Sequence, residues 1–135
     1  MPAKVISGKK IAAEIRAELK PEIDRLKEKQ GVTPGLAVVL VGEDPASQVY
    51  VRMKGRACEE MGMHSESIVL PESTSEHELL ATVDRLNEDP AIHGMIVQLP
   101  VPDHIDANKV LRRIDPRKDV DGFHPENVGK VAIGD

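Results

Sequence analysis

The chain has 135 residues, 18 of them basic and 23 acidic, which gives a formal net charge of −5. This length suits one compact domain, and the acidic balance argues against nucleic acid as a partner. Because the sequence has one Tyr, one Phe and no Trp, its core must be aliphatic. A domain of this size buries enough apolar surface to fold without disulfides or a structural metal.

The cysteine content and the length of the apolar runs indicate where in the cell the protein is expected. Cys58 is the single cysteine, the first 15 residues lack the apolar segment of a secretory signal, and the longest apolar run is 36–41. A membrane-spanning helix needs about 20 apolar residues. We therefore expect a cytoplasmic protein with no membrane partner.

Two elements are predicted before residue 42. Apolar residues recur three and four apart over 8–29, which predicts an amphipathic helix in which Pro21 forms a kink or a break. The run 36–41 is short, continuous and rich in valine, as is typical of a strand buried on both faces. The apolar positions of the helix are Ile11, Ile15, Leu19, Ile23 and Leu26.

A second helix is predicted after this strand. Either Asp44-Pro45 or Ser47 can cap its first turn, and Gly62 can end it. Its expected apolar stripe consists of Val49, Met53, Ala57 and Met61.

The rest of the chain continues the alternation of strands and helices. A strand is predicted over 67–70, and a capping box at 75–78 opens the next helix. A third strand covers 94–98, a helix begins at Pro102-Asp103, and 119–122 is a turn.

This alternation predicts an α/β fold with three αβα layers around a mainly parallel sheet. In such sheets, ligands bind beyond the carboxyl ends of the strands. Three segments reach that edge: 42–54, 98–103 and 119–124.

Tyr50 and Lys54 are candidate functional residues in the second helix. They lie four residues apart and therefore share one helical face, next to the expected apolar stripe. Partial burial would favour the uncharged amine of Lys54 and suit it to proton transfer. The residues alone also allow a plain alternative, in which Lys54 is a solvated surface charge and Tyr50 a core residue.

Gln98 and an acidic pair are further candidates. Gln98 ends a strand and precedes a proline-rich segment that holds the chain extended, so its amide could orient an amine or simply face water. Asp119 and Asp121 alternate about Val120, so only one of them can face a site. Asp121-Gly122 is also an ordinary turn pair.

The sequence gives no support for a metal site, a nucleophilic cysteine or a nucleotide-phosphate site. The five histidines have no metal-ligand spacing, and Cys58 has no designated base, so it is expected to be a core residue. Neither a dinucleotide fingerprint nor a P-loop is present.

Three motifs resemble those of one enzyme family. They are VGEDPASQVYVRMK at 41–54, GMIVQLPVP at 94–102 and PRKDVDGF at 116–123, and two shorter matches are HID at 104–106 and NVG at 127–129. Together they make the chain similar to methylenetetrahydrofolate dehydrogenase/cyclohydrolase. The resemblance covers essentially the whole chain and implies that family's amino-acid-dehydrogenase-like N-terminal domain.

The resemblance also implies roles for individual residues. Lys54 would transfer protons, Tyr50 would pack and hydrogen-bond against the folate, and Gln98 would position the Lys54 amine. Asp121 would hold the pterin, because a carboxylate can accept two parallel hydrogen bonds from the ring. Further substrate contacts are expected at Val97 and Leu99, and Ser47 would cap the helix and shape the pocket wall.

Family members oxidise 5,10-methylenetetrahydrofolate to the methenyl compound with NADP, sometimes NAD, and hydrolyse it to 10-formyltetrahydrofolate. They are homodimers of roughly twice this length, with a Rossmann NADP domain after the folate domain and a last helix that returns to pack on the first. The resemblance therefore implies a folate-binding catalytic domain over 1–135, which lacks the NADP domain and, with it, dehydrogenase activity. Its pathway would be one-carbon folate metabolism, including purine biosynthesis.

Two other interpretations stay open from the sequence. One is a non-catalytic folate-binding module that retains the pocket and does no chemistry. The other is an unrelated parallel α/β domain, such as the substrate domain of another dehydrogenase or a protein-interaction module.

Overall fold

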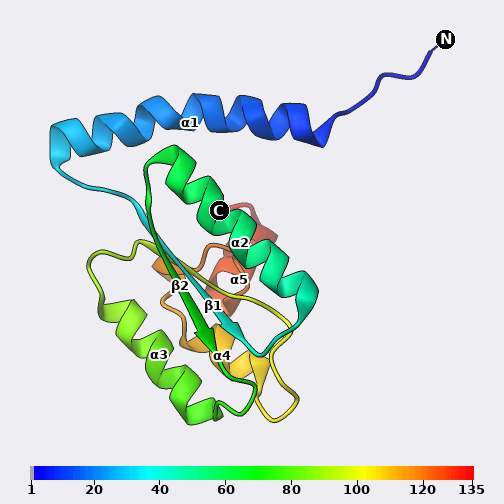
Figure 1. The fold of residues 1–135 in the computed structure, drawn as a ribbon, viewed down its shortest axis with the longest axis vertical. Helices are drawn as coiled ribbons and strands as arrows, with labels where there is room; N and C mark the ends of the chain where they lie inside the picture. Colours follow the sequence, from blue (N-terminus) through cyan, green and yellow to red (C-terminus); the bar gives the residue numbers. More distant parts are fainter. Residues whose placement is uncertain (1) are drawn as a thin grey trace.

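The computed structural model describes residues 2–135. A parallel three-stranded sheet lies at its centre, with β1 (Gly35–Val41) between β2 (His64–Leu70) and β3 (Gly94–Val97). The strands alternate with helices, as Figure 1 shows. This confirms the predicted α/β class. The helical segments are α1 (Gly8–Gln30), α2 (Pro45–Met61), α3 (Glu76–Glu88), α4 (Ala107–Arg113), the 3-10 turn η1 (Pro116–Lys118) and α5 (Pro125–Ile133).

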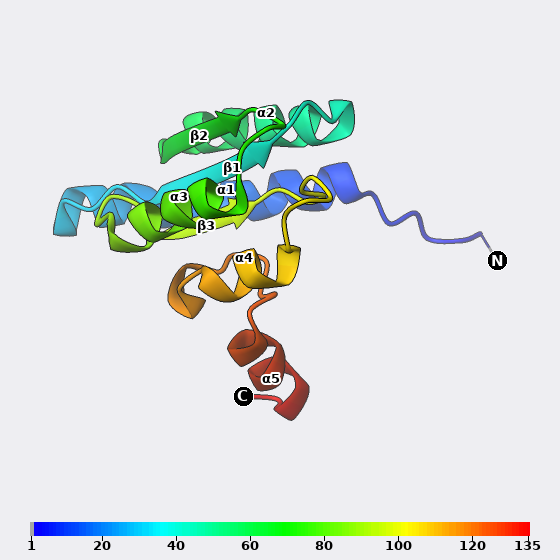
Figure 2. The ribbon, with the colours of Figure 1, turned by 90° about the horizontal axis from the view of Figure 1, so that it is seen from below.

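Helices cover both faces of the sheet, which confirms the three αβα layers. Successive side chains of a strand point to opposite faces. Ala37, Val39 and Val41 of β1 pack with α3 and α4, whereas Val38 and Leu40 pack with Val51 of α2. In the orthogonal view of Figure 2, α2 and the α4–α5 segment lie on opposite sides of the strands.

The buried face of α2 differs from the predicted stripe. Val49 and Met53 are 45% and 60% exposed, whereas Ser47, Val51 and Cys58 are buried. Each four-residue step advances about 40° around a helix, so a stripe through every fourth residue winds from one face to another. It therefore begins in solvent at Val49 and reaches the core only at Met61.

The prediction for α1 is also partly wrong. Pro21 does not break the helix, and Ile23 is its buried residue, while Ile11, Ile15 and Leu19 are 42–49% exposed. A helix of 23 residues is about 35 Å long, longer than a seven-residue strand. Its N-terminal part consequently extends past the sheet (Figure 1).

Several boundaries of the strands and helices also differ from the predicted ones. β2 begins at His64 rather than at residue 67, and β3 ends at Val97. The helix expected from Pro102 begins at Ala107, because Asp106 caps it by accepting from the backbone of Asn108. None of the helices within residues 2–135 is both long and apolar enough to cross a membrane.

We expect the substitution Ser75→Ala to lower the free energy of unfolding by about 1 kcal/mol. Ser75 Oγ accepts from Glu78 N at 3.1 Å, and the Glu78 carboxylate accepts from Ser75 N at 3.0 Å, so both partners of the predicted capping box are in place. Urea unfolding of the two proteins measures the difference. The exposed Glu88→Ala serves as a control, and equal stability of Ser75→Ala and the parent would contradict the cap's contribution.

Candidate functional site

A cleft of about 260 Å³ opens at the carboxyl edge of the sheet. It brings together side chains from α2, from the segment after β3 and from the loop after η1. These are three segments that the sequence places at this edge. The cleft is lined by Lys54, Ile96, Val97, Gln98, Leu99, Asp121 and Phe123.

Lys54 and Gln98 are in direct contact. Lys54 Nζ donates a hydrogen bond to Gln98 Oε1 at 2.7 Å, although the residues lie 44 positions apart. Both side chains are half-buried. Because the amide oxygen accepts this bond, it holds the lysine amine in one place at the rim of the cleft.

The backbone around Gln98 is held by the sheet. Gln98 N donates to Val39 O at 2.8 Å, which continues the pairing of β3 with β1 by one residue. The following peptide, Leu99–Pro100, is cis. Gln98 thus projects from an ordered strand end, and Val97 and Leu99 on either side of it also line the cleft.

The start of α2 places Lys54, and Asp44 caps that start. Asp44 Oδ2 accepts from both Ser47 N and Ser47 Oγ at 2.8 Å, and these hydrogen bonds lower the pKa of the Asp44 carboxyl. Ser47 is only 2% exposed and does not line the cleft. The prediction that Ser47 caps the helix is therefore wrong, because Asp44 is the cap and the Ser47 hydroxyl donates to it, and Ser47 does not form a wall of this cleft.

Only one residue of the acidic pair lines the cleft, as the alternation about Val120 predicts. Asp121 is exposed and lines the cleft, whereas Asp119 is half-buried and accepts hydrogen bonds from His124 N and Asn127 Nδ2. Tyr50 lies one turn before Lys54 in α2 and is 55% exposed, but it does not line the cleft itself.

Phe123 is a site residue that the analysis of single residues missed. It is half-exposed and lines the cleft beside Asp121. It is also the single Phe of the chain. An exposed aromatic side chain next to a polar turn is a usable signal, since aromatic rings supply flat apolar surface to ligands.

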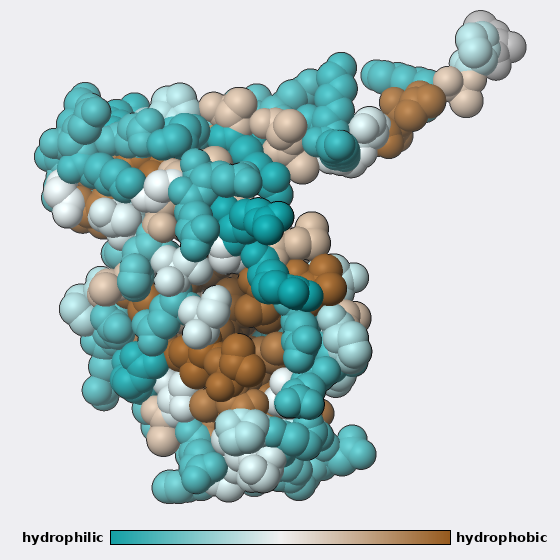
Figure 3. All heavy atoms as spheres, viewed as in Figure 1, coloured by the Kyte–Doolittle hydropathy of each residue, from teal (hydrophilic) through white to brown (hydrophobic). Residues whose placement is uncertain are grey.

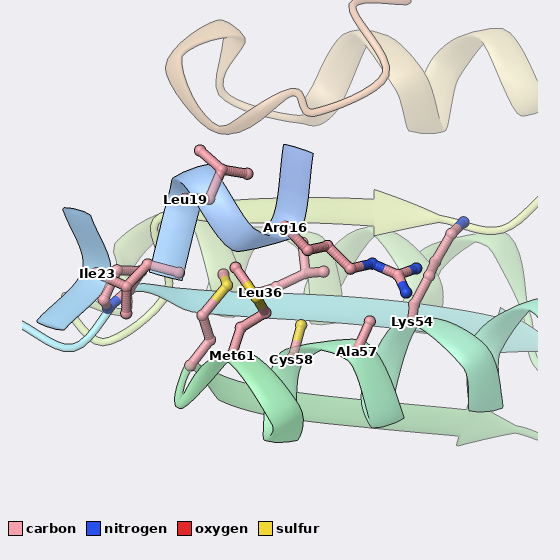
Figure 4. Close-up of a pocket in the computed structure, with 10 residues that line it drawn as sticks. Arg16, Leu19, Ile23, Leu36, Lys54, Ala57, Cys58 and Met61 are labelled. Carbon is pink, nitrogen blue, oxygen red and sulfur yellow. The ribbon is translucent and has the colours of Figure 1, made fainter. Parts of the chain in front are cut away.

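A second, apolar groove of about 430 Å³ lies between α1 and α2. Figure 4 shows the Arg16 side chain extending along it toward Lys54. Leu19, Cys58 and Met61 belong to its walls. In the space-filling view of Figure 3, α1 is largely polar on the side that faces the viewer, and apolar residues gather lower down, between α2 and α3.

Cys58 and the histidines offer no alternative site. Burial raises the pKa of the Cys58 thiol, which disfavours the nucleophilic thiolate. Within residues 2–135, no group of three or more His, Cys, Asp or Glu side chains is placed to hold a metal ion.

The described residues do not fit NADP at the position where dinucleotide folds bind it. Such folds place the pyrophosphate against a glycine-rich turn between the first strand and its helix. Here that turn carries Glu43 and Asp44, and the Asp44 carboxylate already occupies the amide of Ser47. Two carboxylates at a helix start repel a phosphate.

Several known proteins are similar to this chain. It is 64% identical over its full length to the bifunctional protein FolD of Moorella thermoacetica, of which it covers 48%. A crystal structure of the bifunctional enzyme FolD from Campylobacter jejuni matches 94% of the chain with a TM-score of 0.91 and 49% identity, over 45% of that protein.

A third relative is known with ligands. The Trypanosoma brucei methylenetetrahydrofolate dehydrogenase-cyclohydrolase, solved with NADP cofactor and an inhibitor, matches 98% of the chain with a TM-score of 0.94 and 41% identity, over 46% of that protein. The chain thus spans about half the length of these relatives. Residues 6–121 match the model of the tetrahydrofolate dehydrogenase/cyclohydrolase catalytic domain. The chain therefore belongs to the tetrahydrofolate dehydrogenase/cyclohydrolase catalytic-domain family.

Proposed function

We propose that these 135 residues are a folate-binding catalytic domain that hydrolyses 5,10-methenyltetrahydrofolate to 10-formyltetrahydrofolate. The observation that carries the proposal is the 2.7 Å hydrogen bond between Lys54 Nζ and Gln98 Oε1, at the rim of a cleft that Asp121 also lines. The match to the tetrahydrofolate dehydrogenase/cyclohydrolase catalytic domain supports this class of substrate.

Lys54 carries the proton transfer in this proposal. Hydrolysis needs a proton removed from water as it attacks the methenyl carbon, and a proton supplied to a ring nitrogen as the ring opens. Lys54 and Asp121 are the titratable side chains in the lining of the cleft. Because Asp121 accepts the hydrogen bonds of the pterin ring, Lys54 is left to move protons, and Tyr50 packs against the folate one helical turn away.

Oxidation of the methylene compound belongs to the full-length protein. NADP supplies a hydride acceptor when bound, and we assign its binding to a Rossmann domain outside these residues, since the Glu43-Asp44 turn does not suit a pyrophosphate. What this chain adds to that step is the orientation of the folate at the cleft. Homodimer formation, cytoplasmic location and a contribution to purine biosynthesis are further predictions for the full-length protein, and a mass measurement in solution tests the first of them.

An assay of the 135-residue chain tests the proposed activity. Loss of the methenyltetrahydrofolate absorbance is followed with the chain and with buffer alone. A faster, saturable rate supports the catalytic domain. Saturable folate binding with a rate equal to buffer supports the non-catalytic module, and absence of folate binding overturns the proposed folate site in this chain.

We expect Gln98→Ala to lower turnover about tenfold while folate affinity changes by less than about threefold. The substitution leaves Lys54 in place and removes the oxygen that orients its amine. Steady-state rates and equilibrium binding separate the two effects. Gln98→Glu retains an acceptor and is expected to recover part of the rate, whereas an unchanged rate in Gln98→Ala would show that the amide does not position the lysine.

A further inference from the structure

The segment that carries Asp121 has little regular structure of its own. Residues 119–124 join η1 to α5, and an isolated parallel bridge between Asp119 and Met95 ties this loop to β3. Asp121 and Phe123 are both exposed within it. A surface loop of this kind holds a ligand-binding carboxylate in place only if other contacts restrict its backbone.

Those contacts converge on one oxygen atom. Asp119 Oδ2 accepts from His124 N at 2.8 Å and from Asn127 Nδ2 at 2.9 Å. The same Asn127 amide nitrogen also donates to Pro116 O at 2.9 Å. The Asp119 carboxylate thus bonds the residue that ends the loop and a residue of α5, while its own backbone is fixed on β3.

Packing beneath the loop supports the same arrangement. A Cβ atom built at Gly94, the first residue of β3, would lie 2.7 Å from Val120 Cγ2. The absence of a side chain at Gly94 therefore lets Val120 lie against the start of the strand that ends next to Gln98. Asp119 and Asp121, on either side of Val120, are held relative to that strand.

We propose that Asp119, with Asn127, is a positioning residue that holds Asp121 in register with Lys54 and Gln98 for folate binding. Asp119 does not line the cleft, and its carboxylate is engaged by the backbone and by Asn127, so it acts through Asp121 and not on the substrate. This inference rests on the proposed folate site.

A double-mutant cycle tests the proposal in the 135-residue chain, with 5-formyltetrahydrofolate as the probe. We expect Asp119→Ala to weaken binding about tenfold, and the same substitution in an Asp121→Ala background to cause no further loss. A merely structural role would weaken binding equally in both backgrounds. Asp119→Asn retains an oxygen that can accept both hydrogen bonds and is expected to recover most of the affinity.

Two further variants and a stability measurement complete the test. Asn127→Ala removes one of the two donors and is expected to give a smaller loss in the same direction, and thermal unfolding is measured for each variant. Glu126→Gln removes an exposed ion pair with Lys130 on the same helix and is expected to leave binding unchanged.

The outcomes separate the two proposals. If the parent chain does not bind the probe, the folate site and the positioning role are both overturned. If the parent binds and Asp119→Ala binds equally well, or the loss is the same with and without Asp121, only the positioning role is overturned.

Discussion

Replacing Lys54 by methionine is expected to slow the hydrolysis of methenyltetrahydrofolate about 100- to 10,000-fold, the usual contribution of a positioned acid or base. Methionine keeps much of the length and apolar body of the lysine but has no proton to give or take. Because Lys54 is half-buried and its amine reaches Gln98, a side chain of similar length and apolar body should leave the shape of the cleft largely unchanged.

Rate and affinity must be measured together for this variant. Folate affinity is expected to change little, so the loss should be seen in the turnover number. Arg56→Met is the matched control, since Arg56 lies on the same helix, is exposed and does not line the cleft. A Lys54→Met chain that hydrolyses the substrate at the parent rate would remove Lys54 from the mechanism.

Replacing Asp121 by alanine is expected to weaken folate binding by about 2 kcal/mol, or about 30-fold in Kd. The ring donors that the carboxylate accepts in the proposed complex would lose their charged partner. Asp121 itself is exposed, so the stability of the free chain should change little. This variant is therefore expected to change the folate affinity and not the stability of the chain.

Titration calorimetry with 5-formyltetrahydrofolate measures this change. Asp103→Ala is a suitable control, because Asp103 is an exposed acid in the loop after β3 that does not line the cleft. Equal affinities for Asp121→Ala and the parent would mean that the pterin is held by other groups.

Local patterns predicted the elements better than the faces that those elements bury. The run 36–41 became β1 almost to the residue, and Ser75 caps α3 as its spacing indicates. These features depend on residues that are close together in the chain, so a short stretch of sequence is enough to predict them. The stripe through Val49 failed because a four-residue repeat alone does not say which side of α2 meets the sheet.

The candidate site, too, was only partly predictable from local patterns. The motifs pointed to Lys54, Gln98 and Asp121 through their likeness to a family, and the structure brings these three to one cleft. Composition and spacing by themselves left open whether Lys54 is a proton-transfer residue or an ordinary surface charge. Phe123 was missed because its exposure follows from where the loop packs, which no local pattern encodes.

By itself, the sequence predicted an acidic, aliphatic α/β domain, the order of its strands and helices up to the turn at 119–122, the sheet edge at which the candidate cleft opens, and through its motifs the enzyme family. Tertiary structure alone decided that α1 leaves much of its apolar side exposed, that Ser47 is buried outside the cleft, and that Asp119 anchors a loop while Asp121 lines the cleft. Caps and periodicity arise between residues close in the chain, whereas these outcomes depend on contacts such as Lys54 with Gln98, 44 residues apart, which form only when the whole sheet and its helices pack.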